Sequence, residues 1–303
     1  MSAYRIALVT ARAARDLDED LPPLVDALRA AGADVAALDW DDASVDWSAW
    51  HVAALRSPWD YTQRLPEFLA WAQRAAAATA LVNPVDIVRW NTDKHYLADL
   101  ERAGVAIVPS RFVEPGDDAA AKLDGFLADF PTAAEFVVKP CVGAGSRDAR
   151  RHARSALDHA LSHTRSLIDA GRSVVLQPYL DRVDDHGETA LVYLDGAFSH
   201  AIRKGPLLRR GEDATRALFA AEHITPRTPS DAELALGART LAAIPADAPL
   251  LYARVDLIHD GAGQPRVLEL ELSEPSLFFA HGAGSADRYA AAVLRRASAV
   301  RTA

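Results

Sequence analysis

The chain has 303 residues, of which 50% are hydrophobic and 25% are charged, as is usual for a folded protein with room for two or three lobes. Its formal net charge of −9 argues against binding to nucleic acid or to an anionic membrane surface. The single cysteine, Cys141, excludes an intrachain disulfide, and the N-terminus lacks signal-peptide features, so a cytoplasmic location is predicted.

Residues 1–83 alternate strand and helix patterns, which predicts a lobe of parallel βαβ units. Strands are expected at 5–10, 35–38, 52–55 and 80–82, and helices at 21–31 and 66–78. Ligands of such lobes bind beyond the carboxyl ends of the strands. The loops after the first and third strands should therefore face one crevice. Four polar residues of the third loop become candidates for substrate recognition: Arg56, Ser57, Asp60 and Tyr61.

From residue 91 the pattern changes to mixed helices and antiparallel hairpins. Asn91 or Thr92 is expected to cap a helix that ends at Gly104. Further helices are predicted at 119–129, 155–170 and 286–297, and strands at 135–139 and 173–176. Hairpin turns are predicted at Asp195-Gly196 and within 259–265. The fold class is therefore an α/β lobe followed by an α+β part.

The second hairpin carries the most chemistry. If its turn is centred between Ala262 and Gly263, Asp256 lies opposite Glu269 and Arg254 lies opposite Glu271. The other face should be aliphatic, formed by Ala253, Val255, Leu257, Leu268, Leu270 and Leu272. Carboxylates directly opposite each other repel, and hard oxygen ligands at this spacing suit Mg²⁺. The same pattern would also arise on a solvated face with cross-strand ion pairs.

Lysine is rare in this chain, with only Lys94, Lys122, Lys139 and Lys204. Lys94 is expected in the first turn of a helix and Lys139 at the end of a strand, and compact ammonium groups in such positions suit phosphate. A lysine at a strand end is also commonly a plain surface residue. The small-residue loop with Gly143, Gly145 and Ser146 could cover phosphates with its N–H groups or could be a simple turn.

The order of these blocks resembles the ATP-grasp superfamily: NTDKHYL, FVVKP, GAGS, LQPYL, RVD and LELE. The resemblance runs from residue 84 to 303, and residues 1–83 look like the pre-ATP-grasp lobe that precedes it in this superfamily. It implies a smaller nucleotide-covering lobe at 110–178. A metal and catalytic lobe would then be built from 84–109 with 179–303.

The resemblance also implies roles for individual residues. Lys94 and Lys139 would hold ATP phosphates, Arg254 would stabilise the acyl phosphate, and Arg254, Lys94 and Arg203 would be the catalytic residues. The adenine hinge would be Gln177, Tyr179 and Leu180, and the ribose ligand Asp184 or Asp185. Mg²⁺, with Mn²⁺ as a substitute, would bind Asp256, Glu269 and Glu271. Arg203 and Lys204 would reach the transferred phosphate, although a turn at Asp195-Gly196 would also make Glu188 and Arg203 a structural cross-strand pair.

Three longer blocks, RSPWDY, VRWNTDKHYL and LELELSEPSLFF, are similar to one branch, the cyclo-ligases that close the ring of D-cycloserine from O-ureido-D-serine. This similarity implies a small amino-acid-derived substrate whose carboxylate becomes an acyl phosphate and is attacked by a nitrogen of the same molecule. Glu274 and Ser276 join the candidate substrate contacts. An intermolecular carboxylate–amine ligase and a non-catalytic nucleotide-binding protein stay as alternatives, and a homodimer is left open.

Overall fold

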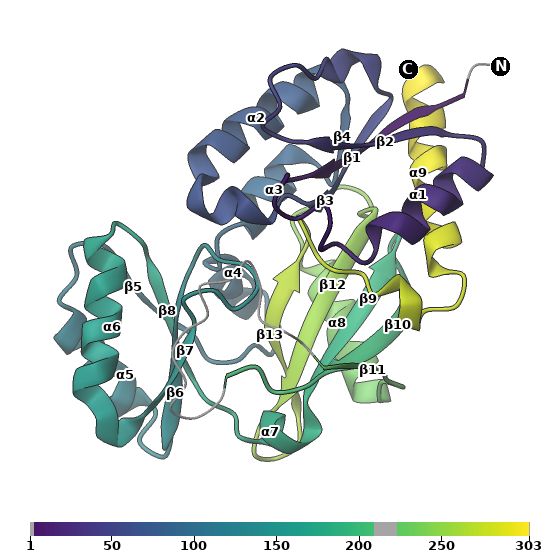
Figure 1. The fold of residues 1–303 in the computed structure, drawn as a ribbon. Helices are drawn as coiled ribbons and strands as arrows, with labels where there is room; N and C mark the ends of the chain where they lie inside the picture. The colour runs from purple at the N-terminus through teal and green to yellow at the C-terminus, as the bar shows by residue number, and fades with distance from the viewer. Residues whose placement is uncertain (1–2, 209–222, 303) are drawn as a thin grey trace.

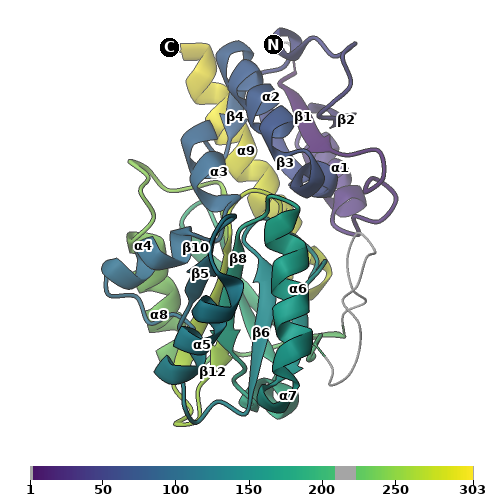
Figure 2. The same cartoon turned by 90° about the vertical axis from the view of Figure 1, so that its left-hand side faces the viewer.

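The computed structural model describes residues 3–208 and 223–302, and these residues form three β-sheets with helices on their faces (Figure 1). The order of the sheets follows the chain, with the N-terminal sheet uppermost in Figure 1. Both labelled termini lie at the same end of the molecule in Figures 1 and 2. The α/β and α+β class expected from the sequence is confirmed.

The N-terminal sheet is parallel, with strand order β2-β1-β3-β4. Its strands are β1 (Arg5–Thr10), β2 (Asp34–Asp39), β3 (Val52–Ser57) and β4 (Ala80–Val82). The helices α1 (Leu21–Ala30) and α9 (Ser285–Thr302) cover one face, and α2 (Leu65–Ala78) and α3 (Val85–Asn91) cover the other (Figures 1 and 2). Side chains alternate between these faces along β1, since Ile6 packs towards α1 and α9 whereas Ala7 packs towards α2. The C-terminal helix thus completes the core of the N-terminal lobe.

The second sheet is antiparallel, with order β5-β8-β6-β7. Its strands are β5 (Arg111–Val113), β6 (Glu135–Pro140), β7 (Arg150–Ala153) and β8 (Val174–Pro178). The helices α5 (Ala119–Asp129) and α6 (Leu157–Asp169) pack on one face, on the left of Figure 1. The opposite face is thereby left to contribute to the site.

The third sheet is antiparallel, with order β11-β10-β9-β12-β13. Its strands are β9 (Glu188–Leu194), β10 (Ala197–Lys204), β11 (Ile224–Pro226), β12 (Tyr252–His259) and β13 (Pro265–Glu271). The helices α4 (Tyr96–Arg102) and α8 (Asp231–Ala242) cover its apolar face, and α7 (Arg182–His186) precedes β9. The short 3₁₀ segments are Trp47–Ala49, Trp59–Gln63, Arg154–Ala156 and Phe279–His281.

The single helix expected from residue 91 to Gly104 is wrong. Helix α3 ends at Asn91 and α4 begins at Tyr96, so Lys94 lies in the turn between them. The break has a physical cause in Asn91, whose amide donates to Leu270 O at 2.7 Å and accepts from Leu272 N at 2.7 Å. This pairing draws the end of α3 against β13 and leaves the Lys94 N–H to bind Cys141 O at 2.9 Å.

A β-bulge overturns the predicted pairing of Glu188 with Arg203. The register of β9 and β10 shifts between Phe198 and His200, so Lys204 lies opposite Glu188 and Arg203 lies opposite Thr189. Each later residue of β10 is thereby turned to the opposite face from the one expected.

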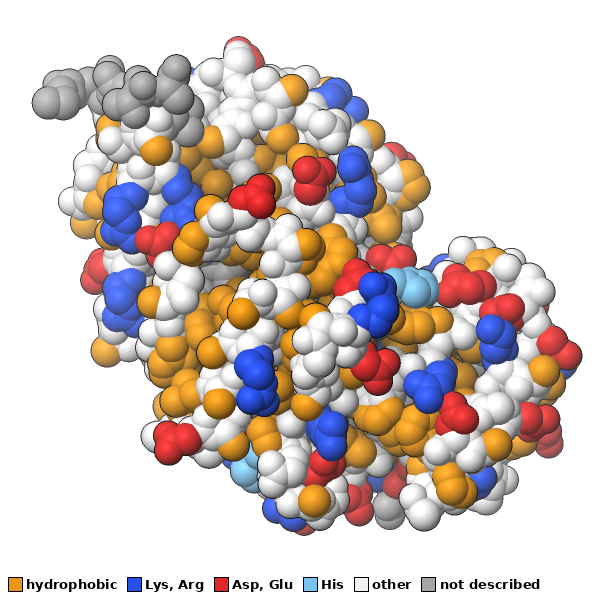
Figure 3. All heavy atoms as spheres, turned by 180° about the vertical axis from the view of Figure 1, so that it is seen from behind, with side chains coloured by type: hydrophobic (Ala, Val, Ile, Leu, Met, Phe, Trp, Pro, Cys, Tyr) orange, Lys and Arg blue, Asp and Glu red, His pale blue; other side chains and the backbone are white. Residues whose placement is uncertain are grey.

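Acidic and basic side chains are interspersed with apolar ones on the face shown in Figure 3, rather than gathered by sign. No helix within the described ranges has both the length and the apolar character needed to cross a membrane.

Candidate active site

A cavity of about 500 Å³ lies where the three parts of the fold meet, bounded by the second sheet, the third sheet and the loop before α9. Most of the residues singled out in the sequence line it: Lys94, Lys139, Gly143, Gly145, Ser146, Gln177, Tyr179, Leu180, Glu188, Lys204, Arg254, Glu269, Glu271, Glu274 and Ser276. Asp256 lies behind this wall, and the remaining candidates do not line it: Arg56, Ser57, Asp60, Tyr61, Asp184, Asp185 and Arg203.

The hairpin of β12 and β13 has the predicted pairs, with Arg254 opposite Glu271 and Asp256 opposite Glu269. Asp256 is only 1% exposed, and both of its oxygens are engaged. Arg254 Nε and Nη2 donate to them at 2.8 and 2.7 Å, and Lys204 Nζ lies 2.7 Å from Oδ2. Although burial alone would raise the pKa of Asp256, Arg254 and Lys204 hold it below its usual range. Asp256 therefore fixes two cations at the back of the cavity.

The other two carboxylates of the hairpin face the cavity. Lys94 Nζ lies 2.8 Å from Glu269 Oε1, and Arg254 is ion-paired with Glu271. Burial, together with the like charges of Asp256 and Glu269, raises the pKa of Glu271 to about 8 despite Arg254. Glu271 is therefore the carboxylate of the hairpin whose ionised form the surroundings favour least.

Lys139 differs from Lys94, Lys204 and Arg254 because no carboxylate of the described residues lies within ion-pair distance of its Nζ. Burial, with Lys94 nearby, lowers the pKa of Lys139. The small-residue loop that follows Lys139 along the chain also lines the cavity, and its Gly143 O accepts a hydrogen bond from Lys94 Nζ at 2.9 Å. An anion entering beside Lys139 would meet an ammonium group that forms no ion pair with a described carboxylate.

Gln177 and Tyr179 form the segment that joins the second and third sheets. Gln177 Nε2 donates to Ser110 Oγ at 2.9 Å, and the Tyr179 N–H donates to Glu135 O at 2.9 Å. The Arg151 guanidinium stacks 3.5 Å from the centre of the Tyr179 ring. These contacts fix the segment as one wall of the cavity.

The acidic residues after this segment are placed differently from expectation. Asp184 is tied to Arg151 at 3.1 Å and to the Tyr179 hydroxyl, and both Asp184 and Asp185 are exposed outside the cavity. Glu188 lines the cavity instead, paired with Lys204. Asp184 and Asp185 lie on α7, away from the cavity wall. Of the acidic residues 184, 185 and 188, only Glu188 is therefore in a position to contact a ligand in the cavity.

Arg203 also points away from the cavity. Its Nε donates to His186 O at 2.8 Å and its Nη2 to Asp185 O at 3.0 Å, so it braces α7. The bulge in β10 is the reason, since it brings Lys204 rather than Arg203 to the cavity face.

A second bulge lies in β13, where Leu268 is the extra residue opposite the step from Asp256 to Leu257 of β12, and it changes one expected position. Val267 packs in the core with Leu270 and Leu272, whereas Leu268, expected on that apolar face, lines the cavity. The extra residue at the bulge reverses the alternation of side chains from that point towards the turn.

The candidate residues of the N-terminal lobe form a support behind the cavity. The Thr10 and Ser57 hydroxyls meet at 2.8 Å, so the ends of β1 and β3 lie side by side, but both residues are fully buried and neither lines the cavity. Arg56 is wholly buried, 3.5 Å from Asp18 and 3.4 Å from Asp20, and it donates to Pro275 O at 3.2 Å. Burial would lower the pKa of Arg56, but the two aspartates raise it above its usual value.

Tyr61 and Asp60 have separate partners. The Tyr61 hydroxyl donates to Glu274 Oε1 at 2.6 Å, whereas Asp60 accepts from Trp40 Nε1 at 2.8 Å and pairs with Arg64 at 2.8 Å. Burial raises the pKa of Glu274 to about 7, although the Tyr61 hydrogen bond opposes this. Tyr61 thus acts on the cavity through Glu274, and Asp60 lies outside it.

Comparisons with known proteins agree over nearly the whole chain. Residues 6–83 match the family model described as the N-terminal domain of D-cycloserine synthetase DcsG. The cycloserine biosynthesis protein DcsG of Streptomyces lavendulae is 42% identical over 295 residues, 96% of this chain and 98% of the relative. The chain belongs to the D-cycloserine synthetase family of ATP-grasp ligases.

Solved structures place the fold of this ligase in the same group. The crystal structure of D-cycloserine synthetase DcsG superposes with a TM-score of 0.92 at 41% identity, covering 97% of this chain and 99% of that one. The ATP-grasp ligase PsnB, complexed with a precursor variant, Mg and ADP, has a TM-score of 0.66 at 18% identity over 98% of this chain and 99% of its own. The second likeness concerns the fold alone.

The donor set of this ligase fits a magnesium ion. Glu269 and Glu271 present hard carboxylate oxygens to the cavity, with side chains 26% and 23% exposed. Burial first, and then the neighbouring carboxylates, raise the pKa of Glu271, and a divalent cation would offset both effects as a proton does. Asp256 fits less well as a direct ligand, because Arg254 and Lys204 occupy its oxygens.

Other cavity residues were not anticipated from the sequence. Asp20 accepts hydrogen bonds from the backbone of Phe278 at 3.0 Å and Phe279 at 2.8 Å, and it lines the cavity with Trp59 and Phe278. The signal available was position, because Asp20 follows β1 in the loop that leads into α1, on the crevice side of a parallel sheet. Nothing in the sequence indicated that it would hold a loop more than 250 residues away.

Proposed function

We propose that this ligase converts O-ureido-D-serine to D-cycloserine with ATP and Mg²⁺. ATP phosphorylates the substrate carboxylate, and the ureido-bearing nitrogen of the same molecule attacks the acyl phosphate. One carboxylate oxygen leaves with phosphate, while the ureido carbonyl departs as CO₂ and ammonia after water supplies an oxygen. The observation that carries the proposal is the 42% identity to DcsG over 96% of the chain, since it spans the substrate end as well as the nucleotide end.

The nucleotide end supplies positive charge where phosphate would lie. Lys94, Lys139 and Lys204 come from three different segments and converge on one cavity. Phosphoryl transfer depends on positioning and charge neutralisation more than on covalent help from protein. Mg²⁺, held by Glu269 and Glu271, would supply further neutralisation of the phosphate oxygens.

Arg254 is proposed to stabilise the acyl phosphate. Asp256 holds two of its nitrogens, and its Nη1 donates to Ser276 O at 3.0 Å. Its guanidinium also lies 5.5 Å from the centre of the Phe278 ring. These contacts hold the Arg254 guanidinium in place before the reaction. It therefore needs little reorganisation when negative charge develops on the acyl phosphate, and such preorganisation is what makes electrostatic stabilisation effective.

The substrate is proposed to lie at the end of the cavity formed by Trp59, Glu274 and Ser276. Glu274 can ionise near neutral pH, so its carboxylate suits the substrate amino group. Because the nucleophilic nitrogen is tethered to the activated carboxylate, ring closure needs no site for a second amino acid.

A single-substrate assay tests this proposal. O-ureido-D-serine with Mg-ATP should yield ADP, phosphate and the ring product by mass spectrometry, and added amino acids should leave ADP release unchanged. A product with the mass of a dipeptide, formed only when two amino acids are present, would replace cyclisation with intermolecular ligation.

A further inference from the structure

A second group of polar side chains lies outside the cavity, where α7, α8 and the end of β12 meet. It consists of His186, the last residue of α7, Glu233 in the first turn of α8, and His259, the last residue of β12. One ligand atom from each lies within 4.8 Å of the other two. They line a separate hollow of about 490 Å³ that also contains Arg182 and Arg227.

These three side chains hold buried polar atoms that lack hydrogen-bond partners. His186 Nε2, Glu233 Oε1 and His259 Nδ1 are all inaccessible and unsatisfied. Glu233 and His259 are 3% and 8% exposed. An unsatisfied buried polar atom costs roughly 1–3 kcal/mol, so each of these three side chains has a polar atom that its protein contacts leave unexplained.

Glu233 is oriented for such a partner. Its Oε2 accepts from Ser230 N at 2.7 Å and Ser230 Oγ at 2.9 Å in the capping box of α8, which leaves Oε1 directed at His259 Nε2, 3.8 Å away. A carboxylate anchored through one oxygen and open at the other is a common support for a metal ligand.

We propose that His186, Glu233 and His259 bind one divalent transition-metal ion of the zinc class. Two imidazoles and a carboxylate are a ligand set that Zn²⁺ accepts, with metal–ligand distances of about 2.0–2.2 Å and room for water in the fourth position. Closing atoms that lie within 4.8 Å to that geometry requires side-chain rotation of the kind that ligand binding brings about. Such an ion would join α7 and β12, whose Val183 and Ile258 are part of the active-site wall.

The protonation states agree with this placement. Burial, with Arg227 and His259 nearby, lowers the pKa of His186, and burial lowers that of His259. Burial opposes ionisation of Glu233, but the hydrogen bonds that it accepts and His259 keep its pKa below the usual value. Two neutral imidazoles and one carboxylate are the forms that bind metal. The positive charges of Arg182 and Arg227 will weaken the binding without occupying the ligand atoms.

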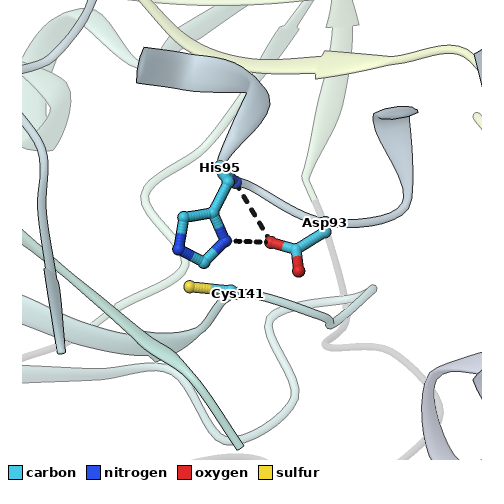
Figure 4. A group of neighbouring side chains, drawn as sticks. All are labelled: Asp93, His95 and Cys141. Carbon is cyan, nitrogen blue, oxygen red and sulfur yellow. Dashed lines mark hydrogen bonds and ion pairs between the residues drawn. The ribbon is translucent and has the colours of Figure 1, made fainter. Parts of the chain in front are cut away.

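The group of Asp93, His95 and Cys141 in Figure 4 is a contrasting case. Both ring nitrogens of His95 are engaged, with Asp93 Oδ1 at 2.6 Å and Glu114 Oε1 at 2.9 Å. These carboxylates outweigh burial and raise the pKa of His95, while burial raises that of the Cys141 thiol. Because both ring nitrogens of His95 already have carboxylate partners, this group serves as an internal control.

The test is Zn²⁺ titration of tag-free protein by calorimetry in excess Mg²⁺, which occupies the active-site carboxylates but does not compete for imidazole. We expect one equivalent of Zn²⁺ to bind and to raise the melting temperature. His186→Ala and Glu233→Gln should abolish this binding, and the glutamine variant keeps a residue that can complete the capping box. Ser230→Ala should weaken it about 10–100-fold, as loss of a residue that orients a ligand does.

Two control variants should bind Zn²⁺ as the wild type does: Cys141→Ser in the contrasting group, and His159→Ala at an exposed position of α6. Circular dichroism confirms that each variant is folded before titration. Absence of the one-equivalent binding in the wild type would overturn the proposal. Retention of that binding in both His186→Ala and Glu233→Gln would also overturn it.

Discussion

Replacing Lys139 with methionine separates the effect of its half-buried charge on stability from the effect of that charge on ATP binding. The ammonium lies in the cavity wall without a carboxylate partner among the described residues, and burial lowers its pKa. Because the pKa of Lys139 is lower in the folded protein than in the unfolded chain, the folded protein binds the ammonium proton less tightly. At neutral pH the charged lysine therefore lowers the free energy of unfolding. This destabilisation disappears only when the pH rises through the folded pKa. Lys139→Met should therefore raise the melting temperature of the free enzyme.

The same substitution should weaken ATP binding. A charge-assisted hydrogen bond contributes roughly 1.5–3 kcal/mol, so its loss should raise the Kd for ATP about 10–100-fold. The assays are calorimetric titration of Mg-ATP and thermal melting of the free protein. Lys122→Met is the matched control, because Lys122 lies in the same lobe, is 46% exposed and is paired with Asp117 at 3.1 Å. Unchanged ATP affinity in Lys139→Met would refute the reasoning, whatever happens to stability.

Three other substitutions probe the rest of the site. Glu269→Gln should lower kcat about 100-fold or more while the melt stays cooperative, because the apolar face of the hairpin is untouched; near-normal ADP release at saturating Mg²⁺ would contradict its role. Arg56→Ala should lower the free energy of unfolding by about 3–5 kcal/mol, because Asp18 and Asp20 lose their buried partner. The same variant should raise the KM for the amino-acid substrate more than the KM for ATP. An unchanged denaturation midpoint would count against the structural role of Arg56. The Tyr61 hydrogen bond stabilises the ionised form of Glu274, so Tyr61→Phe should raise the pKa of Glu274 and move the acidic limb of the kcat/KM profile to higher pH. A pH profile identical to that of the wild type would exclude this role of Tyr61.

The sequence predicted those parts of the site that depend on local alternation. Counting back from one turn placed Arg254 opposite Glu271 and Asp256 opposite Glu269, because antiparallel pairing carries little ambiguity over so short a hairpin. The aliphatic face behind them followed from the same alternation, apart from Leu268.

The errors arose where the chain departs from that alternation. The bulges in β10 and β13 each insert one residue, Ser199 and Leu268, so that Arg203 contacts α7 and Leu268 lines the cavity. A bulge of this kind has no residue signature that the sequence reveals. The break before Lys94 and the burial of Arg56 arise from partners distant in sequence, namely the backbone of β13 and the loop that contains Pro275. Such contacts are properties of the packed fold and not of any local pattern.

The proposed activation of the substrate carboxylate can be tested most directly by isotope transfer. O-ureido-D-serine carrying heavy oxygen in its carboxylate is turned over with Mg-ATP, and the released phosphate is analysed by mass spectrometry. An acyl-phosphate mechanism predicts one heavy oxygen in the phosphate for each ring closed, with ADP as the nucleotide product. Unlabelled phosphate, or AMP and pyrophosphate in place of ADP and phosphate, would contradict it.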